Sequence, residues 1–278
     1  MNDEPRVADL LAQARAAGVD RLDAQLLLAR LLARPRTWLL AHDDAALDPT
    51  QLSAWSSLLA RRAAGEPLAY LLGEKEFRGL LLRVNANVLV PRPETEILVD
   101  WAIELLNGAL RDRSAHRVAD LGTGSGAIAI AIKHTCSAAH VSATDASAAA
   151  LDVARANAHE LGTSISFAAG SWWEALGDAR FDLVLSNPPY VAAADPHLAA
   201  LCHEPRAALT PGGDGLDALR QIIAGAPDHL TPGAWLLVEH GYDQAHAVQA
   251  LLATHGFGEI ATRADLAGQP RCTGGCHR

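Results

Sequence analysis

The second part of the chain alternates between short apolar segments and helical segments. From about Arg117 onward, segments rich in strand-forming residues are separated by segments with helical spacing. Short strands separated by helices of this length are typical of a doubly wound parallel sheet, in which ligands bind at the carboxyl ends of the strands. The expected strands are 118–121, 141–145, 165–168, 181–186 and 235–239, and the expected helices are 127–133, 148–161, 216–223 and 245–254.

A glycine-rich turn follows the first of these strands. It reads Asp120-Leu-Gly122-Thr-Gly124-Ser-Gly126 and leads directly into a helix. Glycines at such a junction permit a tight turn and let the backbone lie against a ligand without side-chain interference. The spacing is Gly-x-Gly-x-Gly, which differs from the dinucleotide fingerprint, and no Gly-Lys-Ser/Thr follows, which argues against a phosphate-binding P-loop.

Asp145 ends the second strand, about twenty residues further on, where an acid is placed to accept hydrogen bonds from both hydroxyls of a ribose. A ribose site without a pyrophosphate site indicates S-adenosylmethionine as the cofactor. The glycines alone are also compatible with an ordinary strand-to-helix turn. Their combination with Asp145 at this spacing favours the cofactor site.

The strand 181–186 ends abruptly at Asn187-Pro188-Pro189-Tyr190. Pro188 biases Asn187 toward an extended backbone, and each proline fixes its own φ and removes an amide donor. A stiff strand end results, which presents an Asn amide, carbonyl acceptors and an aromatic ring. These groups suit a planar –NH₂ group, although Asn-Pro and Pro-Pro also occur as ordinary turns.

The first part of the chain reads as helical. Val7, Leu10 and Leu11 have helical spacing, residues 22–32 form a densely apolar segment, and Asp48-Pro49 is a good N-cap followed by a first-turn proline. We expect a helical substrate-docking domain at 1–72 and a β-hairpin linker at 73–92, with its turn at residues 85–87. A catalytic domain is expected at 93–278.

Composition restricts the partners. Lys and Arg number 23 against 32 Asp and Glu, giving a net charge of −9, and the basic residues form no runs, which argues against direct nucleic-acid binding. The N-terminus lacks an apolar signal segment, and no apolar run reaches the ~18–20 residues of a membrane helix. We therefore expect a soluble cytoplasmic protein that does not bind a membrane. The spacing Cys272-x-x-x-Cys276-His277 is not that of a usual zinc pair, so no metal site is expected.

Together with the glycine loop, Asp145 and Asn187–Tyr190, further segments resemble the family of peptide chain release factor glutamine (N5) methyltransferases. This family is part of the class I S-adenosylmethionine-dependent methyltransferases. The resemblance covers nearly the whole chain, but the family's usual Asn-Asp-Arg is replaced by Gln269-Pro270-Arg271, and the tail 272–278 also departs. The resembling segments are 65–73, 90–96, 204–206, 213–216, 239–242 and 265–268.

This resemblance implies an α/β fold: a doubly wound, mostly parallel Rossmann-like methyltransferase sheet with a small N-terminal helical bundle joined by a β-hairpin linker. It implies methyl transfer from S-adenosylmethionine, leaving S-adenosylhomocysteine, to the glutamine of the Gly-Gly-Gln motif in class I peptide chain release factors. The implied cofactor contacts are Gly122, Thr123, Gly124, Ser125, Gly126, Asp145, Trp172 and Asn187. The implied glutamine contacts are Asn187, Pro188, Pro189 and Tyr190.

The mechanism that we hypothesise uses Asn187, Pro188 and Tyr190. The Asn187 side-chain carbonyl and the Pro188 main-chain carbonyl would accept the two amide hydrogens of the glutamine, and Tyr190 would stack on the amide plane. An alternative substrate is an exocyclic amine of adenine or guanine in nucleic acid, which presents the same planar –NH₂. A third possibility is a binding adaptor that has lost its activity.

Overall fold

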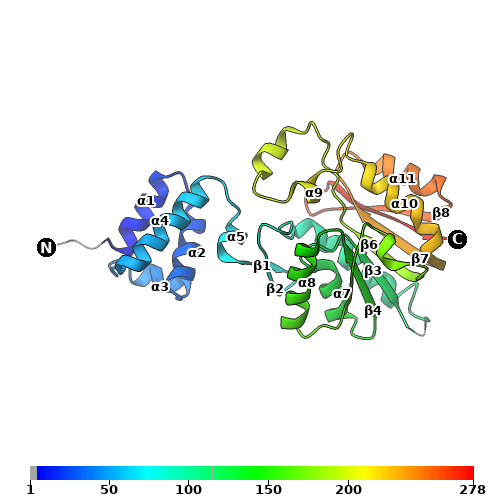
Figure 1. The fold of residues 1–278 in the computed structure, drawn as a ribbon, viewed down its shortest axis with the longest axis horizontal. Coiled ribbons are helices and arrows are strands. Elements are labelled where there is room, and N and C mark those ends of the chain that lie inside the picture. Colours follow the sequence, from blue (N-terminus) through cyan, green and yellow to red (C-terminus); the bar gives the residue numbers. More distant parts are fainter. Residues whose placement is uncertain (1–4, 114) are drawn as a thin grey trace. The chain divides into compact units, whose positions relative to one another are not determined.

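The computed structural model describes residues 5–113 and 115–278, and the fold is drawn in Figure 1. The described residues fall into two compact units. The first ends at Glu74 and the second begins at Lys75, so the boundary falls inside a short strand.

The first unit is a bundle of helices. It contains α1 (Val7–Ala16), α2 (Arg21–Leu31), α3 (Arg36–Ala41), α4 (Pro49–Ala63) and α5 (Leu68–Leu72). The core of this unit includes Leu28, Leu39 and Trp55, each at most 1% exposed. Trp55 satisfies its indole N–H by donating to Gln13 Oε1 at 3.1 Å, which ties α4 to α1.

The expected N-cap at the start of α4 is confirmed. Asp48 Oδ1 accepts from Gln51 N at 2.8 Å, and Gln51 Oε1 accepts from Asp48 N at 3.0 Å. This reciprocal pair is a capping box, which satisfies two backbone donors that the helix itself leaves unpaired. Pro49 occupies the first turn, where its missing N–H costs nothing.

The expected hairpin is present, but its turn is not at residues 85–87. Strands β1 (Glu74–Phe77) and β2 (Leu80–Arg83) are joined by Arg78-Gly79, whose φ values are +49° and +76°. Two left-handed residues in a row match the twist of a two-residue hairpin. Asn85 instead closes a separate turn through its side chain, which accepts from Asn87 N at 2.9 Å.

A seven-stranded sheet forms the centre of the second unit, in the order β5-β4-β3-β6-β7-β9-β8 within its described residues. The five expected strands are confirmed, with shifts of one residue or an N-terminal extension: β3 (Arg117–Leu121), β4 (His140–Asp145), β5 (Ser166–Ala169), β6 (Phe181–Ser186) and β7 (Leu230–Glu239). These five strands run parallel to one another. The expected doubly wound, mostly parallel α/β fold is therefore confirmed.

Two strands were not expected. They are β8 (Phe257–Ala264) at the edge of the sheet and β9 (Pro270–His277), which lies antiparallel between β7 and β8. The β8–β9 register shifts between Gly258 and Ala261. The tail that departs from the family's sequence is thus part of the sheet, with Cys272 buried in β9.

Alternate residues of the central strands face opposite layers of helices. Leu183 of β6 and Leu237 of β7 belong to the core shared with α6 (Glu96–Asn107) and α7 (Ala127–Thr135). Val184 and Leu236 belong to the core shared with α10 (Asp217–His229) and α11 (Ala245–Thr254). Burial on both faces explains why β6 is buried along its whole length.

The remaining elements of the second unit are short or lie beside the sheet. They are η1 (Pro93–Thr95), α8 (Ala148–Glu160), η2 (Glu174–Leu176), η3 (Pro196–Leu201) and α9 (Arg206–Leu209). In the part of the chain that the structure describes, no helix is long and apolar enough to cross a membrane. Nor do three or more His, Cys, Asp or Glu side chains gather there as ligands for a metal ion.

Gly274 in β9 is expected to be intolerant of a side chain. A Cβ atom at this position would lie 2.3 Å from Leu237 Cδ2 and 2.9 Å from the Leu236 carbonyl oxygen. The substitution Gly274→Ala should therefore lower the free energy of unfolding by about 1–3 kcal/mol, as overpacking of a core does. Urea unfolding measures this difference.

The matched control is Gly258→Ala on the neighbouring strand β8. Its Cβ atom would meet the guanidinium end of Arg278, which is flexible and free to move. This control should cost clearly less than Gly274→Ala. Equal costs for the two variants would contradict the packing described for β9.

Candidate active site

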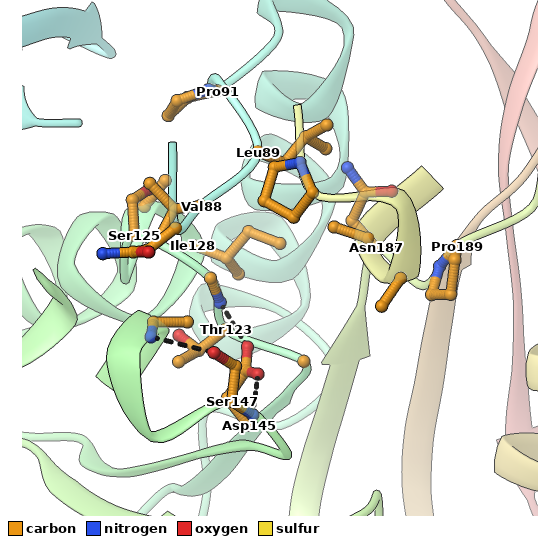
Figure 2. A pocket seen from close by; sticks show the side chains of 18 of the residues that line it. Val88, Leu89, Pro91, Thr123, Ser125, Ile128, Asp145, Ser147, Asn187 and Pro189 are labelled. Atoms are coloured by element: carbon orange, nitrogen blue, oxygen red, sulfur yellow. Dashed lines mark hydrogen bonds between the residues drawn. The ribbon is translucent and has the colours of Figure 1, made fainter. Parts of the chain in front are cut away.

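Three neighbouring strand ends form the site. In the ladders, Leu121 at the end of β3 pairs with Thr144 of β4 and with Ser186 of β6. The Ser186 hydroxyl also donates to the Leu121 carbonyl at 2.7 Å, which fixes this register. The residues that follow these three line one cavity of about 290 Å³, shown in Figure 2: Gly122, Asp145 and Asn187.

The glycine loop adopts the backbone that only glycine adopts readily. Gly122, Gly124 and Gly126 have φ values of +72°, +55° and +85°. A Cβ atom on Gly124 would meet no atom within 4 Å, so the loop backbone is open to the cavity at this point. A Cβ atom on Gly126 would lie 3.2 Å from Ala154 Cβ, so Gly126 serves the packing of α7 on α8 and does not line the cavity.

Asp145 is held in place by backbone donors. Its Oδ2 accepts from Gly124 N at 2.9 Å, and its Oδ1 accepts from Ser147 N at 2.8 Å, as the dashed lines in Figure 2 show. Each carboxylate oxygen has a second lone pair for a ligand. Two acceptor oxygens at fixed positions beside the glycine loop suit the two adjacent hydroxyls of a ribose.

A buried carboxyl supports the glycine loop from below. Asp120 is 1% exposed, and its Oδ2 accepts from Thr123 Oγ1 at 2.6 Å and from Ala129 N at 3.2 Å. Its Oδ1 is buried without a hydrogen-bond partner. Burial raises the pKa of Asp120 to about 7. Asp120 is thus a buried acceptor that fixes the glycine loop through Thr123.

Trp172 forms one wall of the cavity in a strained backbone conformation. Its φ is +47°, which costs a residue other than glycine about 1–2 kcal/mol. The conformation brings the indole against the loop, since a Cβ atom on Gly122 would lie 3.1 Å from Trp172 Cζ3. Trp172 Nε1 donates to Gln221 Oε1 at 3.1 Å. The ring is thus fixed as a flat apolar wall, which suits the face of a planar base.

Asn187 lies across the cavity from Asp145 (Figure 2). Its Nδ2 donates to Thr95 Oγ1 at 3.0 Å, which leaves Oδ1 as the free acceptor of the amide. Pro189 also lines the cavity, whereas Pro188 is buried and Tyr190 stands behind the lining. The Tyr190 hydroxyl donates to Glu239 Oε1 at 3.1 Å. Burial and the nearby Glu239 raise the pKa of Tyr190, so this hydroxyl remains a donor at neutral pH.

Sequence reasoning did not find the residues that roof the cavity. The roof comes from segments 87–92 and 205–208. Glu204, which is 6% exposed, joins them: its Oε2 accepts from Val90 N at 3.1 Å, and its Oε1 accepts from the Arg92 guanidinium. The resemblance marked both segments, but no pattern within either one indicates that they meet.

Comparison with known proteins identifies similar sequences over nearly the whole chain. Residues 96–216 match the family described as "Methyltransferase small domain", and residues 6–73 match the "PrmC N-terminal domain". The release factor glutamine methyltransferase of Bordetella pertussis is 51% identical over 270 residues, covering 96% of this chain and 97% of that protein. That of Burkholderia pseudomallei is 47% identical over 281 residues, covering 98% and 97%.

Solved structures show a similar fold. The chain resembles the Thermus thermophilus 16S rRNA N2 G1207 methyltransferase in complex with AdoMet and guanosine, with a TM-score of 0.54, 18% identity, and coverage of 74% of this chain and 50% of that chain. It also resembles the hMettl16 catalytic domain, with a TM-score of 0.57, 18% identity, and coverage of 78% and 81%. At these identities the likeness concerns the fold alone.

The sheet order, the glycine loop and the cavity at the strand ends define a class I S-adenosylmethionine-dependent methyltransferase. Identity of about one half over nearly the full length narrows this class to one family. The chain belongs to the release factor glutamine methyltransferases. The resemblance inferred from the sequence is therefore confirmed, and methylation of a nucleic-acid amine is not favoured.

The contacts of Glu204 predict that its removal weakens the packing of segments 87–92 and 205–208 over the cavity. Glu204→Ala leaves the buried Val90 N–H without its acceptor and frees Arg92. A lost interaction of about 1.4 kcal/mol corresponds to a ten-fold change in dissociation constant. We expect S-adenosylhomocysteine to bind about ten-fold more weakly, as calorimetry measures.

The control variant is Glu160→Ala, which removes a half-exposed partner of Arg83 away from the cavity. Its affinity for S-adenosylhomocysteine should equal that of the unmodified protein. If Glu204→Ala also bound with unchanged affinity, the roof would not contribute to the cofactor site.

Proposed function

We propose that this protein methylates the side-chain amide nitrogen of the glutamine in the Gly-Gly-Gln motif of class I peptide chain release factors. The observation that carries the proposal is one cavity lined by both the glycine loop with Asp145 and by Asn187. The proposed site for the methyl donor and the proposed site for the amide that receives the methyl group thus share one cavity. Membership of the release factor glutamine methyltransferases supports the choice of substrate.

S-adenosylmethionine supplies a methyl group already activated on a sulfonium. The chemical groups that line the cavity are complementary to those of this cofactor. Asp145 offers acceptors for ribose hydroxyls, the open backbone at Gly124 admits close approach, and Trp172 provides a wall for the base. Thr123 and Ser125 complete the loop and line the cavity.

Asn187 and Pro188 orient the glutamine. An amide nitrogen is a poor nucleophile because its lone pair is delocalised into the carbonyl. Asn187 Oδ1 and the Pro188 main-chain carbonyl accept the two amide hydrogens, which turns the lone pair toward the methyl donor. Pro189 lines this side of the cavity, and the stacking of Tyr190 on the amide plane, which the sequence suggested, is not supported because Tyr190 is not among the lining residues.

Positioning supplies most of the rate enhancement in this proposal. Two reactants held in the right geometry save up to ~7–11 kcal/mol of the barrier. The carbonyl acceptors also stabilise the positive charge that grows on nitrogen as it is alkylated, and they require no reorganisation because Asn187 is already held by Thr95. The charge is lost when one of the two amide hydrogens leaves as a proton to solvent. No nucleophilic side chain and no metal is required for a transfer of this kind.

The macromolecular part of the substrate needs a second contact surface. The described residues of the first unit have their own apolar core, and none of them lines the cavity. We assign to it the docking of the intact release factor, which makes 1–72 a substrate-docking domain, 73–92 a linker and 93–278 the catalytic domain. Release factors act in translation, so the enzyme works in the cytoplasm.

The direct test is transfer of a labelled methyl group from S-adenosylmethionine to purified release factor. We expect label on the release factor, but not on tRNA, rRNA or DNA offered under the same conditions. A release factor with the motif changed to Gly-Gly-Ala is the matched control and should remain unlabelled. Label on this control, or on nucleic acid alone, would overturn the proposal.

Asn187→Ala should lower kcat by about a hundred-fold or more, as removal of one preorganised polar group does in other active sites. Binding of the release factor should change little, because one side chain of the docking surface is lost. Steady-state kinetics and a separate binding assay distinguish the two effects. Asn107→Ala, at the exposed end of α6, is the control, and a kcat for Asn187→Ala within a few-fold of it would contradict the role of Asn187.

Removal of residues 1–72 should affect large and small substrates differently. For the intact release factor we expect KM to rise about ten-fold, because the docking contacts are lost. For a short Gly-Gly-Gln peptide, KM should remain nearly the same. Equal changes for both substrates would mean that the first unit is only a scaffold.

A further inference from the structure

Two buried polar residues contact Asn187 and Tyr190: Thr95, which also lines the cavity, and Glu239, which does not. Thr95, at the end of η1, is 4% exposed, and Glu239, the last residue of β7, is 1% exposed. Thr95 contacts Asn187, and Glu239 contacts Tyr190. Asn187 and Tyr190 of the proposed glutamine site therefore each have a buried polar partner.

We infer that Thr95 and Glu239 are positioning residues, which set the direction of the Asn187 amide and hold Tyr190 in place. This inference rests on the proposed function. It deepens that function by explaining why the oxygen of Asn187, and not its –NH₂ group, is presented to the substrate.

The first step of the argument concerns the Asn187 amide. An Asn side chain presents an acceptor on one side and a donor on the other, and a half-turn about its last bond exchanges them. With Nδ2 donating to Thr95, Oδ1 is the atom left to accept from a glutamine –NH₂. In the opposite orientation, the Asn187 –NH₂ would face the glutamine –NH₂, so two donors would meet and no bond would form.

The second step concerns the Thr95 hydroxyl, which has only one hydrogen. If this hydrogen pointed at Asn187, the amide would turn its oxygen toward Thr95 and the wrong orientation would be stabilised. An acceptor on the other side of Thr95 prevents this. The Thr95 hydroxyl lies near Glu239 and favours its charged form.

The third step concerns the Glu239 carboxyl. Its Oε1 accepts from Tyr190 at 3.1 Å, while Oε2 is buried and has no hydrogen-bond partner of normal geometry. Oε2 is therefore an unused acceptor of a carboxyl that lies near the Thr95 hydroxyl. A small rotation of that hydroxyl satisfies a buried oxygen that would otherwise be costly. The charged carboxyl then draws the Thr95 hydrogen to itself and leaves the Thr95 oxygen to accept from Asn187.

The charge of Glu239 consequently decides the orientation of the amide. Burial raises the pKa of Glu239 to about 7, while Thr95, Tyr190 and the positive charge of Arg271 act in the opposite direction, and Glu94 adds to the rise. Cys272, on the adjacent strand β9, also faces Glu239 and is buried as a neutral thiol, since burial raises its pKa. As the pH falls through about 7, Glu239 gains a proton and no longer draws the Thr95 hydrogen. The productive orientation of Asn187 is then lost, so turnover should rise with pH across this range.

The first experiment compares Thr95→Val with Thr95→Ser in the full-length enzyme. Valine keeps the shape and removes the hydroxyl, whereas serine restores the hydroxyl. We expect Thr95→Val to lower kcat about ten-fold with KM for release factor within about three-fold, and Thr95→Ser to restore most of the loss. Thr254→Val, which makes the same change at the exposed end of α11, controls for the substitution itself.

The second experiment measures kcat against pH for the unmodified enzyme and for Glu239→Gln. The unmodified enzyme should show a step near 7, and the variant should lack that step and be slower throughout. Asp120 also has a pKa of about 7, but it belongs to the cofactor end and is unchanged in this variant. Glu160→Gln, at the surface, should keep the step.

A readout independent of activity separates this inference from the proposed function. In side-chain amide NMR of the cofactor-free protein, the Asn187 signal, assigned by its absence in Asn187→Asp, should shift with pH near 7. It should not shift in Glu239→Gln. This result would support the inference even if no release factor were methylated. The inference is overturned if Thr95→Val keeps its kcat within two-fold, if serine fails to rescue, or if the Asn187 signal moves equally in Glu239→Gln.

Discussion

The register of three parallel strands is the constraint on which the rest of this enzyme depends. Leu121 is level with Thr144 on one side and with Ser186 on the other, so the chain leaves β3, β4 and β6 at one edge of the sheet. A slip of β6 by one residue would displace its end by about 3.3 Å and exchange its two apolar faces. The separate cores under α6 and α10 therefore hold the strand ends in place as well as stabilising the fold.

Two buried carboxyls bind residues of the glycine loop and of the segment Asn187–Tyr190. Asp120 accepts from Thr123 of the glycine loop, Glu239 accepts from Tyr190, and burial raises the pKa of each carboxyl to about 7. A raised carboxyl pKa means that the folded state binds its proton more tightly than the unfolded state does. Stability is then fully present below the unfolded pKa, and it is lost as the pH rises through about 7. At neutral pH the two buried carboxylates therefore lower the free energy of unfolding, while they provide preorganised acceptors for the residues of the site.

The apolar pattern and the glycine spacing correctly predicted those elements whose structure is determined by neighbouring residues in the chain. Strand β6, the loop 122–126 and Asp145 are of this kind, because burial on both faces and left-handed turns leave direct marks in the sequence. Strand β9 was not expected because Gly274 and Gly275 are poor strand formers, but in the structure they lie where Leu237 and Phe257 pack closely. Glu204 and Glu239 lie in segments that resemble the family, but nothing in the sequence around them indicates their roles. Their contacts join segments that are far apart in the chain, and no local sequence pattern indicates such long-range contacts.

Strand β8 has consequences beyond the site, because it forms one open edge of the sheet. An open edge offers unpaired N–H and C=O groups to any passing strand, and is a hazard for aggregation. Here Glu259 has a φ of +49° at the point where the register with β9 shifts, so the edge is bulged. Arg263, further along the same strand, places a charge there and is bound to Glu104 at 2.6 Å. A second chain adding to this edge would have to straighten the bulge and disrupt an ion pair, so the same irregularity that hides β8 from sequence reasoning protects the folded protein against intermolecular strand pairing.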